Sequence, residues 1–280
     1  MNITNIIKEI EKVDPEVYER LDTRRSAMKS FANISGKLAL AAVPLAFGSM
    51  FQKAYAGTKG TADTVTDILN YALTLEYLEA EFYATGVATA GLIPAGDTLM
   101  GIQLISKHEG QHVAFLKAAI AAAGGTAVQS PKFDFTAKGT FSNVFSNFET
   151  FLSVAQTFED TGVRAYKGRA AEIVGGGDYL TAALQIHSVE ARHAAHIRGL
   201  RKAYGSGVGN VKPWITGKMS GINSTAVQAS YDGEEVTTQA TISIVNINGF
   251  SISADAASEA FDEPLSKDQV LAIVGPFIKP

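Results

Sequence analysis

Two copies of the motif Glu-x-x-His are the residues of this sequence best suited to chemistry. Glu109 and His112 form the first copy, and Glu190 and His193 form the second. Residues three positions apart lie on one face of a helix, so each copy presents a carboxylate and an imidazole side by side. Oxygen and nitrogen donors of this kind suit iron or manganese, which indicates a metal site.

Each motif is preceded by a further glutamate at a similar distance. Glu76 lies 33 residues before Glu109, and Glu159 lies 31 residues before Glu190. In a pair of antiparallel helices joined by a short loop, such offsets bring the two residues to the same height. The chain therefore contains a twofold repeat of one glutamate followed by Glu-x-x-His.

This repeat offers enough ligands for two ions. Divalent ions about 3.5–4 Å apart repel each other, and four carboxylates offset their charge. The predicted ligands are Glu76, Glu109 and His112 for one ion, and Glu159, Glu190 and His193 for the other. One glutamate of each motif would bridge the ions. We expect two iron ions or, as the alternative, two manganese ions, because the same ligands suit both metals.

The segments that must position these ligands have the periodicity of amphipathic helices. Apolar residues recur at helical spacing, and the predicted helices span 64–89, 97–123, 142–174 and 178–204. Short loops join the first helix to the second and the third to the fourth, so each pair should be antiparallel. Residues 124–140 are long enough to run the length of a helix. We therefore predict a mainly α fold, a ferritin-like four-helix bundle with a long crossover.

The first predicted helix also resembles a known family. The segment from Leu69 to Glu76, followed by Tyr83, is similar to the first helix of bacterioferritins. The wider stretch 75–83 resembles the exported ferritin-like domain family that includes desiccation-related proteins. The resemblance covers residues 62–204. It implies that the six residues named above are metal ligands, and that Tyr83 lies near the site as a candidate catalytic residue.

Other polar residues near the motifs leave alternatives open. Glu79 is the alternative to Glu76 as a ligand if the register of the first helix is shifted by one turn. His108 precedes Glu109 and is expected to point away from it, toward the surface. The residues expected either to support the ligands or simply to be packed or solvated are His187, His196, Gln156, and the candidate ion pair of Asp160 and Arg192.

The composition excludes other kinds of site. The chain has 280 residues and a net charge of −4, so it lacks the basic excess of a nucleic-acid-binding protein. It has no cysteine, which excludes disulfides, thiolate metal sites, iron–sulfur clusters and cysteine nucleophiles. The glycine-rich loops that bind nucleotides and the Gly-x-Ser-x-Gly motif of hydrolases are also absent from the sequence.

Residues 1–56 have the pattern of an export signal. The pair Arg24-Arg25 precedes an uncharged stretch at 38–52 that is too short to span a bilayer, and Ala54-Tyr55-Ala56 is a small-x-small cleavage site. The paired arginines are typical of a twin-arginine signal, although Ala27 stands where such signals usually carry a large apolar residue. We expect an exported, periplasmic or cell-surface protein with no stable membrane span in the mature chain. The alternative is a buried helix with a chance pair of arginines.

Residues 206–280 are predicted to form a C-terminal extension to the bundle of residues 57–205. Alternation at 236–244 predicts strand or extended chain, and Ser266 is expected to cap a short helix that ends at Val274. Ferritins that form cages have no counterpart to this extension. Its strands could join copies of the chain by strand addition and give a homo-oligomer.

Two functions fit these features. In the first, an exported stress-protection protein binds two metal ions and acts on ferrous iron, O2 or peroxide, as a ferroxidase- or catalase-like oxidoreductase. In the second, the bundle is a non-catalytic structural or interaction module whose extension mediates assembly. The expected partners are metal ions and O2 or peroxide in the first case and further copies of the chain in the second. Neither hypothesis involves nucleic acid.

Overall fold

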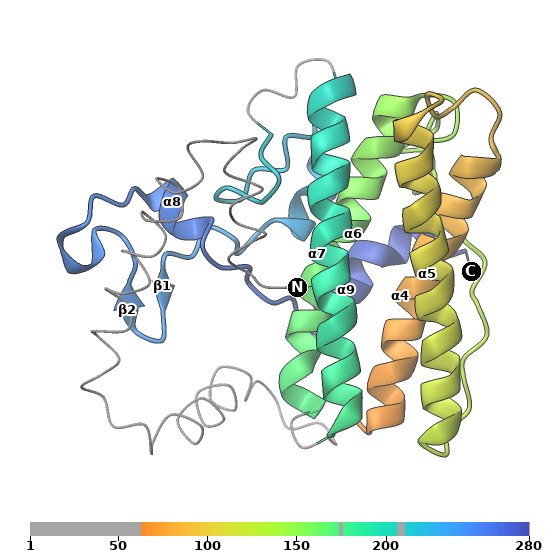
Figure 1. The fold of residues 1–280 in the computed structure, drawn as a ribbon, viewed down its shortest axis with the longest axis horizontal. Helices are drawn as coiled ribbons and strands as arrows, with labels where there is room; N and C mark the ends of the chain where they lie inside the picture. The colour runs from red at the N-terminus through yellow and green to blue at the C-terminus, as the bar shows by residue number, and fades with distance from the viewer. Residues whose placement is uncertain (1–62, 174–175, 206–210, 280) are drawn as a thin grey trace, which may run out of the picture. The chain divides into compact units, whose positions relative to one another are not determined.

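The computed structural model describes residues 63–173, 176–205 and 211–279, and four long helices dominate them. They are α4 (Val65–Ala88), α5 (Asp97–Ala122), α6 (Phe148–Ala170) and α7 (Asp178–Tyr204). α4 packs against α5 and α6 against α7, and the segment between α5 and α6 runs along the bundle (Figure 1). The prediction of a mainly helical four-helix bundle with a long crossover is therefore confirmed.

Local signals in the sequence fix the ends of these helices. At the start of α4, the Thr64 side chain accepts a hydrogen bond from the Asp67 backbone, and the Asp67 side chain accepts one from the Thr64 backbone. At the start of α6, Asn147 caps the helix by accepting a hydrogen bond from the Thr150 backbone at 2.8 Å. α7 follows Gly177, whose φ of 55° lies in the region that favours glycine.

The third helix begins later than predicted, because residues 135–146 form turns instead of helix. The Asp134 carboxylate accepts hydrogen bonds from the backbone N–H groups of Thr136 and Lys138 at 3.0 and 3.1 Å. Lys138 has a φ of 58°, which is incompatible with a right-handed helix. The prediction was also too long at the other end, where α6 gives way to a 3₁₀ turn, η1 (Ala171–Ile173).

The crossover contributes aromatic side chains to the core. Phe133, Phe135 and Phe141 are all buried. The ring of Phe135 meets the ring of Phe82 edge-on at 5.4 Å, and Phe82 stacks on Phe151 at 4.7 Å. These contacts join the crossover to α4 and α6, so the segment is part of the hydrophobic core of the bundle.

The described part of the extension, residues 211–279, contains only short elements. They are η2 (Thr225–Ser230), β1 (Thr238–Gln239), β2 (Ile242–Ser243), η3 (Ile247–Gly249), α8 (Ala254–Ser258), α9 (Lys267–Val274) and η4 (Gly275–Phe277). The alternation at 236–244 thus yields two paired strands of two residues, because Ala240 and Thr241 have positive φ and turn the chain. The predicted last helix is α9, and Ser266 caps it.

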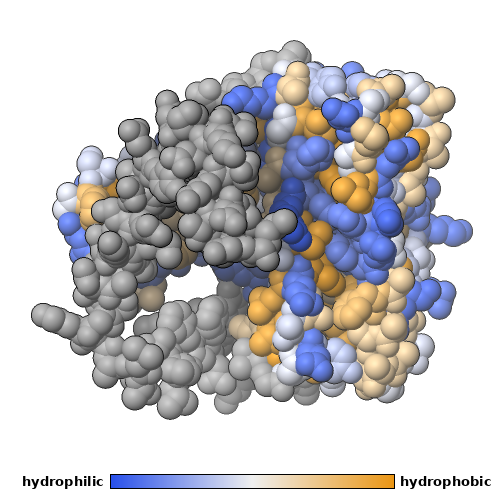
Figure 2. Space-filling view, in the orientation of Figure 1, coloured by the Kyte–Doolittle hydropathy of each residue, from blue (hydrophilic) through white to orange (hydrophobic). Residues whose placement is uncertain are grey.

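The face of the bundle seen in Figure 2 carries both hydrophilic and hydrophobic side chains. Hydrophilic side chains gather at mid-height over α5 and α7, and hydrophobic ones lie nearer the helix ends (Figure 2). Within the described residues, no helix has both the length and the apolar composition that a membrane crossing requires. The predicted export signal, residues 1–56, lies outside the described residues.

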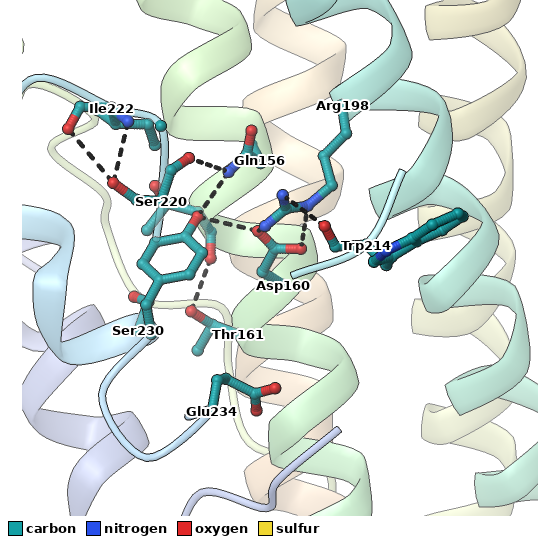
Figure 3. Close-up of polar contacts among 12 residues, drawn as sticks. Gln156, Asp160, Thr161, Arg198, Trp214, Ser220, Ile222, Ser230 and Glu234 are labelled. Carbon is teal, nitrogen blue, oxygen red and sulfur yellow. Dashed lines mark hydrogen bonds and ion pairs between the residues drawn. The ribbon is translucent and has the colours of Figure 1, made fainter. Parts of the chain in front are cut away.

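Buried polar side chains of α6 and α7 hold the extension against the bundle (Figure 3). Asp160 forms an ion pair with Arg198 at 2.5 Å and accepts a hydrogen bond from the Tyr231 hydroxyl at 2.9 Å. Gln156 donates to the same hydroxyl at 2.9 Å. The structure decides between the alternatives left open for these residues: Asp160 pairs with Arg198 while Arg192 is exposed, and Gln156 hydrogen-bonds to the extension and not at the predicted metal ligands.

Arg164 of α6 contacts the extension at several points. Its guanidinium is almost fully buried and donates to the backbone carbonyls of Ser230, Asp232 and Glu263. The Nε atom also lies 2.7 Å from Oε1 of Glu234. Because the other helices cover one side of α6 and the extension covers the other, nearly every residue of α6 is buried.

Candidate metal centre

The structure brings the six predicted ligand residues together between the four helices. Their donor atoms form two overlapping groups, and within each group all the atoms lie within 4.8 Å of one another. One group is Glu76, Glu109, His112 and Glu190, and the other is Glu109, Glu159, Glu190 and His193. The glutamates of the two Glu-x-x-His motifs belong to both groups. The other four residues divide evenly, with one glutamate and one histidine on each side.

The four glutamates are fully buried, and the two imidazoles approach them closely. His112 Nδ1 lies 3.1 Å from oxygens of three different glutamates. His193 Nδ1 lies 2.8 Å from Glu109 Oε1 and 3.5 Å from Glu159 Oε2. An imidazole nitrogen carries at most one proton, so these two rings cannot satisfy all of the carboxylate oxygens around them.

Several atoms of the cluster make close His–Glu contacts but no well-aligned hydrogen bond among the described residues. They are Glu109 Oε1, Glu159 Oε2, both carboxylate oxygens of Glu190, and His193 Nδ1. A buried polar atom without a partner costs free energy, about 1–3 kcal/mol and more when it is charged. Lone pairs that lack a well-aligned proton donor can bind a cation instead, and oxygen with imidazole donors suits iron or manganese. The residues present therefore fit a two-ion site.

The pKa shifts within the cluster also fit a site for cations. Burial raises the pKa of Glu76 and of Glu159 well above the ordinary range of a carboxyl group. Burial by itself would lower the pKa of His112, but hydrogen bonds and charges of the surrounding glutamates outweigh it and raise the pKa to about 12. Without cations the cluster must hold protons, and cations that bind there would displace them.

Comparison with known proteins agrees with this geometry. The family model of the ferritin-like domain matches residues 64–203, which is half of the chain. The chain belongs to the ferritin-like domain family. All six residues of the cluster lie within the matched region. No curated protein and no solved structure gave a match to the sequence.

Two tyrosines of the ferritin-like domain donate hydrogen bonds to the glutamates. Tyr83 of α4 donates to Glu159 of α6, with the two oxygens 2.5 Å apart. Tyr166 of α6 donates in turn to Glu76 of α4. Tyr83 thus lies beside the cluster, and Tyr166 is a second such residue that sequence reasoning missed. Its signal is the repeat itself, because each tyrosine lies seven residues after the glutamate of its own helix.

His108 of the ferritin-like domain contacts the cluster instead of pointing to the surface as expected. Its Nδ1 lies 3.0 Å from His193 Nε2, and the two rings stack with centroids 5.3 Å apart. His108 lies one turn before His112 on the same face of α5, which brings it to the cluster. Its contact fixes the His193 ring with Nδ1 toward the glutamates. His187 bonds to a backbone carbonyl of α6 instead, and His196 is exposed.

Glu79 is a further buried carboxylate beside the cluster. It is 3% exposed but belongs to neither group of donor atoms, so the geometry favours Glu76 over Glu79 as the ligand. Gly162 occupies the corresponding position on α6, three residues after Glu159, and a Cβ atom there would lie 3.3 Å from Glu79 Oε1. Burial raises the pKa of Glu79 well above its ordinary value, and the neighbouring glutamates add to that effect.

Proposed function

We propose that this chain is an exported ferritin-like protein that binds two metal ions and is redox-active toward ferrous iron, O2 or peroxide. The observation that supports the proposal best is that Glu109 and Glu190 belong to both groups of donor atoms. Two shared carboxylates can hold two cations close together despite their repulsion. Four buried glutamates balance the charge of two divalent ions, so the occupied site would be neutral in the core.

Each ion would have a glutamate and a histidine of its own. The assignment is Glu76 and His112 for one ion, Glu159 and His193 for the other, and Glu109 and Glu190 as bridges. Iron is our first choice and manganese the alternative, because this donor set suits both. Bound ions of this kind supply open coordination positions and the electrons of the redox step.

In this proposal the tyrosines hold protons at the centre. Burial raises the pKa of Tyr83 well above its ordinary value, so the hydroxyl stays protonated and donates to Glu159. We assign Tyr83 the catalytic role of giving an electron to the centre together with its hydroxyl proton, which Glu159 would accept. Burial likewise raises the pKa of Tyr166, which donates to Glu76.

Export and stress protection belong to the same proposal. Export is supported by the pair Arg24-Arg25, the uncharged stretch 38–52 and the site Ala54-Tyr55-Ala56. The twin-arginine route carries proteins that are already folded, which suits a protein loaded with metal. Stress protection follows from the resemblance to exported ferritin-like proteins that include desiccation-related members.

Metal content tests the proposal. The full chain is purified without chelator, and iron, manganese and zinc are measured per chain, with about two ions expected. Glu109→Gln removes a shared ligand, so the content should fall to about one ion or fewer. Glu79→Gln is the matched control. It neutralises a glutamate of similar burial that lies outside both donor groups, and it should keep both ions.

Fewer than about one ion per chain in the unaltered protein, with no change in Glu109→Gln, would overturn the proposal. That result would favour the non-catalytic structural role. If two ions bind, consumption of O2 or peroxide by the loaded protein distinguishes a redox function from metal storage.

A further inference from the structure

A groove between α5 and α7 leads from the surface to the candidate metal centre. It has a volume of about 530 Å³, and its lining includes both His112 and His193. Hydrophilic side chains gather over this part of the two helices (Figure 2). A volume of this size is within the range of small-molecule sites, about 300–1,000 Å³. A molecule in the groove would therefore lie against the histidines of the centre.

Apolar side chains form part of the groove. Leu104 and Ile105 of α5 and Val189 of α7 line it. Leu104 is 51% exposed although it lies in the middle of a helix. A molecule that covered this apolar surface would gain free energy from the hydrophobic effect. The groove can therefore take a molecule with an apolar body as well as a small ion.

None of the polar side chains in the groove carries a negative charge. Gln111, Arg192 and His196 are exposed there, and none of them forms a hydrogen bond or ion pair with another described residue. The lining of the groove thus offers one guanidinium and several N–H donors, while the four glutamates of the cluster are fully buried and do not line it. Charge complementarity favours an anion at this place over a ferrous ion.

We infer that the groove binds a small organic carboxylate. Its alkyl part would cover Leu104, Ile105 and Val189, and its carboxylate would pair with Arg192, whose planar guanidinium can bind both oxygens. The inference rests on the proposed function, because the groove ends at the proposed ligands. It deepens that function by naming the class of organic molecule that reaches the centre.

Binding of matched probes tests the inference. Hexanoate and hexylammonium share one alkyl chain and differ in the sign of their charge. Their affinity for the full chain is measured by saturation-transfer NMR and calorimetry, on both chelator-treated and manganese-loaded protein. Hexanoate should bind and hexylammonium should not. Arg192→Gln should lower the affinity for hexanoate about threefold to tenfold, as expected for the loss of one charge-assisted contact near the surface.

Two further variants make the result specific to the groove. Lys202→Gln removes another exposed positive charge from α7 away from the groove, and it should leave hexanoate binding unchanged. Val189→Phe fills the groove without changing its charge, and it should abolish binding. Equal affinity for the two probes, or hexanoate binding that neither Arg192→Gln nor Val189→Phe weakens, would overturn the inference.

Failure of the inference and failure of the proposed function give different results. Hexanoate binding that depends on Arg192, in a chain that holds no metal, supports the groove and contradicts the two-ion centre. Two bound ions per chain without hexanoate binding would support the centre and overturn the groove.

Discussion

At the scale of single residues, each tyrosine beside the cluster donates its hydrogen bond from one helical hairpin to the other. Tyr83 belongs to α4 and donates to Glu159 of α6, while Tyr166 belongs to α6 and donates to Glu76 of α4. Each tyrosine therefore hydrogen-bonds to a glutamate of the other hairpin. We call Glu76 and Glu159 the outer glutamates, because each belongs to only one of the two groups of donor atoms. Because a hydrogen-bonded carboxylate has one preferred orientation, this arrangement aligns both outer glutamates before any ion binds.

Removing one tyrosine should weaken metal binding without unfolding the chain. Tyr166→Phe deletes the donor to Glu76, and we expect the affinity for manganese(II) to fall about tenfold, the lower end of the effect of such partners. Tyr83→Phe should act in the same way through Glu159. Tyr71→Phe is the control, because the Tyr71 hydroxyl is buried but has no hydrogen-bond partner among the described residues.

The measurement is a titration of the metal-free protein with manganese(II), followed by electron paramagnetic resonance. Equal affinities for Tyr166→Phe and Tyr71→Phe would contradict an orienting role for Tyr166.

The residues of the centre differ in how far the sequence predicts them. Helical spacing alone puts each Glu-x-x-His pair on one face, and the hairpin offsets match Glu76 and Glu159 to those pairs. Tyr166 and His108 were missed or misplaced although the seven-residue offset and the i, i+4 spacing put them near the cluster, because their contacts cross from one helix to another. Such contacts depend on side-chain direction and helix packing, which periodicity does not fix.

At the scale of elements, α6 needs a glycine where the extension crosses it. The Leu265 backbone donates to the Arg164 carbonyl at 3.1 Å, so the two backbones lie in direct contact. A Cβ atom on Gly168 would lie 1.9 Å from the Leu265 carbonyl oxygen. Glycine inside a helix costs roughly 0.5–1 kcal/mol relative to alanine, and here that cost permits the extension to dock.

Alanine at this position should therefore destabilise the chain although it favours the helix. We expect Gly168→Ala to lower the free energy of unfolding by about 1–3 kcal/mol, as overpacking does. Gly199→Ala in α7 is the matched control. Gly199 is exposed, and a Cβ atom there would have no heavy atom within 4 Å. That variant should gain roughly 0.5–1 kcal/mol.

Urea unfolding of the two variants measures both effects. If Gly168→Ala were as stabilising as Gly199→Ala, the close contact with Leu265 would be unimportant for stability.

The helices were predictable where apolar residues at helical spacing ran between glycine or proline residues that end a helix. That holds for α5 and α7, which end close to where their apolar periodicity stops. The start of α6 was predicted too early although Asn147 is a capping residue there, because the turn before it depends on one carboxylate, Asp134, and on positive φ at a lysine. The run 236–244 shows the same limit, since its alternation continues through a turn at Ala240 and Thr241 that contains no glycine.

At the scale of the whole molecule, buried charges join the extension to the bundle. Asp160, Arg164 and Arg198 are all nearly inaccessible, and their partners include side chains and carbonyls of the extension. Loss of the extension would leave these charges without those partners, which is strongly destabilising for buried groups. The sequence could not show this, because carbonyl acceptors in irregular chain have no pattern of residue types.

The buried pair of Arg164 and Glu234 should make the stability of the whole chain depend on pH. Burial raises the pKa of Glu234 from its ordinary 4.5 to about 7, although the charge of Arg164 acts against that rise. Between these two values the folded chain keeps a proton that the unfolded chain has lost. The contribution of this proton to the free energy of unfolding is therefore full below pH 4.5 and is lost as the pH rises through about 7.

Glu234→Gln should remove this dependence, because glutamine keeps the shape and cannot ionise. Between pH 4.5 and 7, the stability of the unaltered chain relative to Glu234→Gln should fall by up to about 3 kcal/mol. Taking the difference between the two proteins cancels the titration of the distant glutamate cluster, since sites without shared partners contribute additively.

Urea unfolding of both proteins at several pH values measures this difference in stability. Glu235→Gln, an exposed neighbour, is the control and should show no such fall. A flat difference for Glu234→Gln would mean that Arg164 keeps Glu234 ionised across this range and that the extension stays bound to the bundle without a proton there.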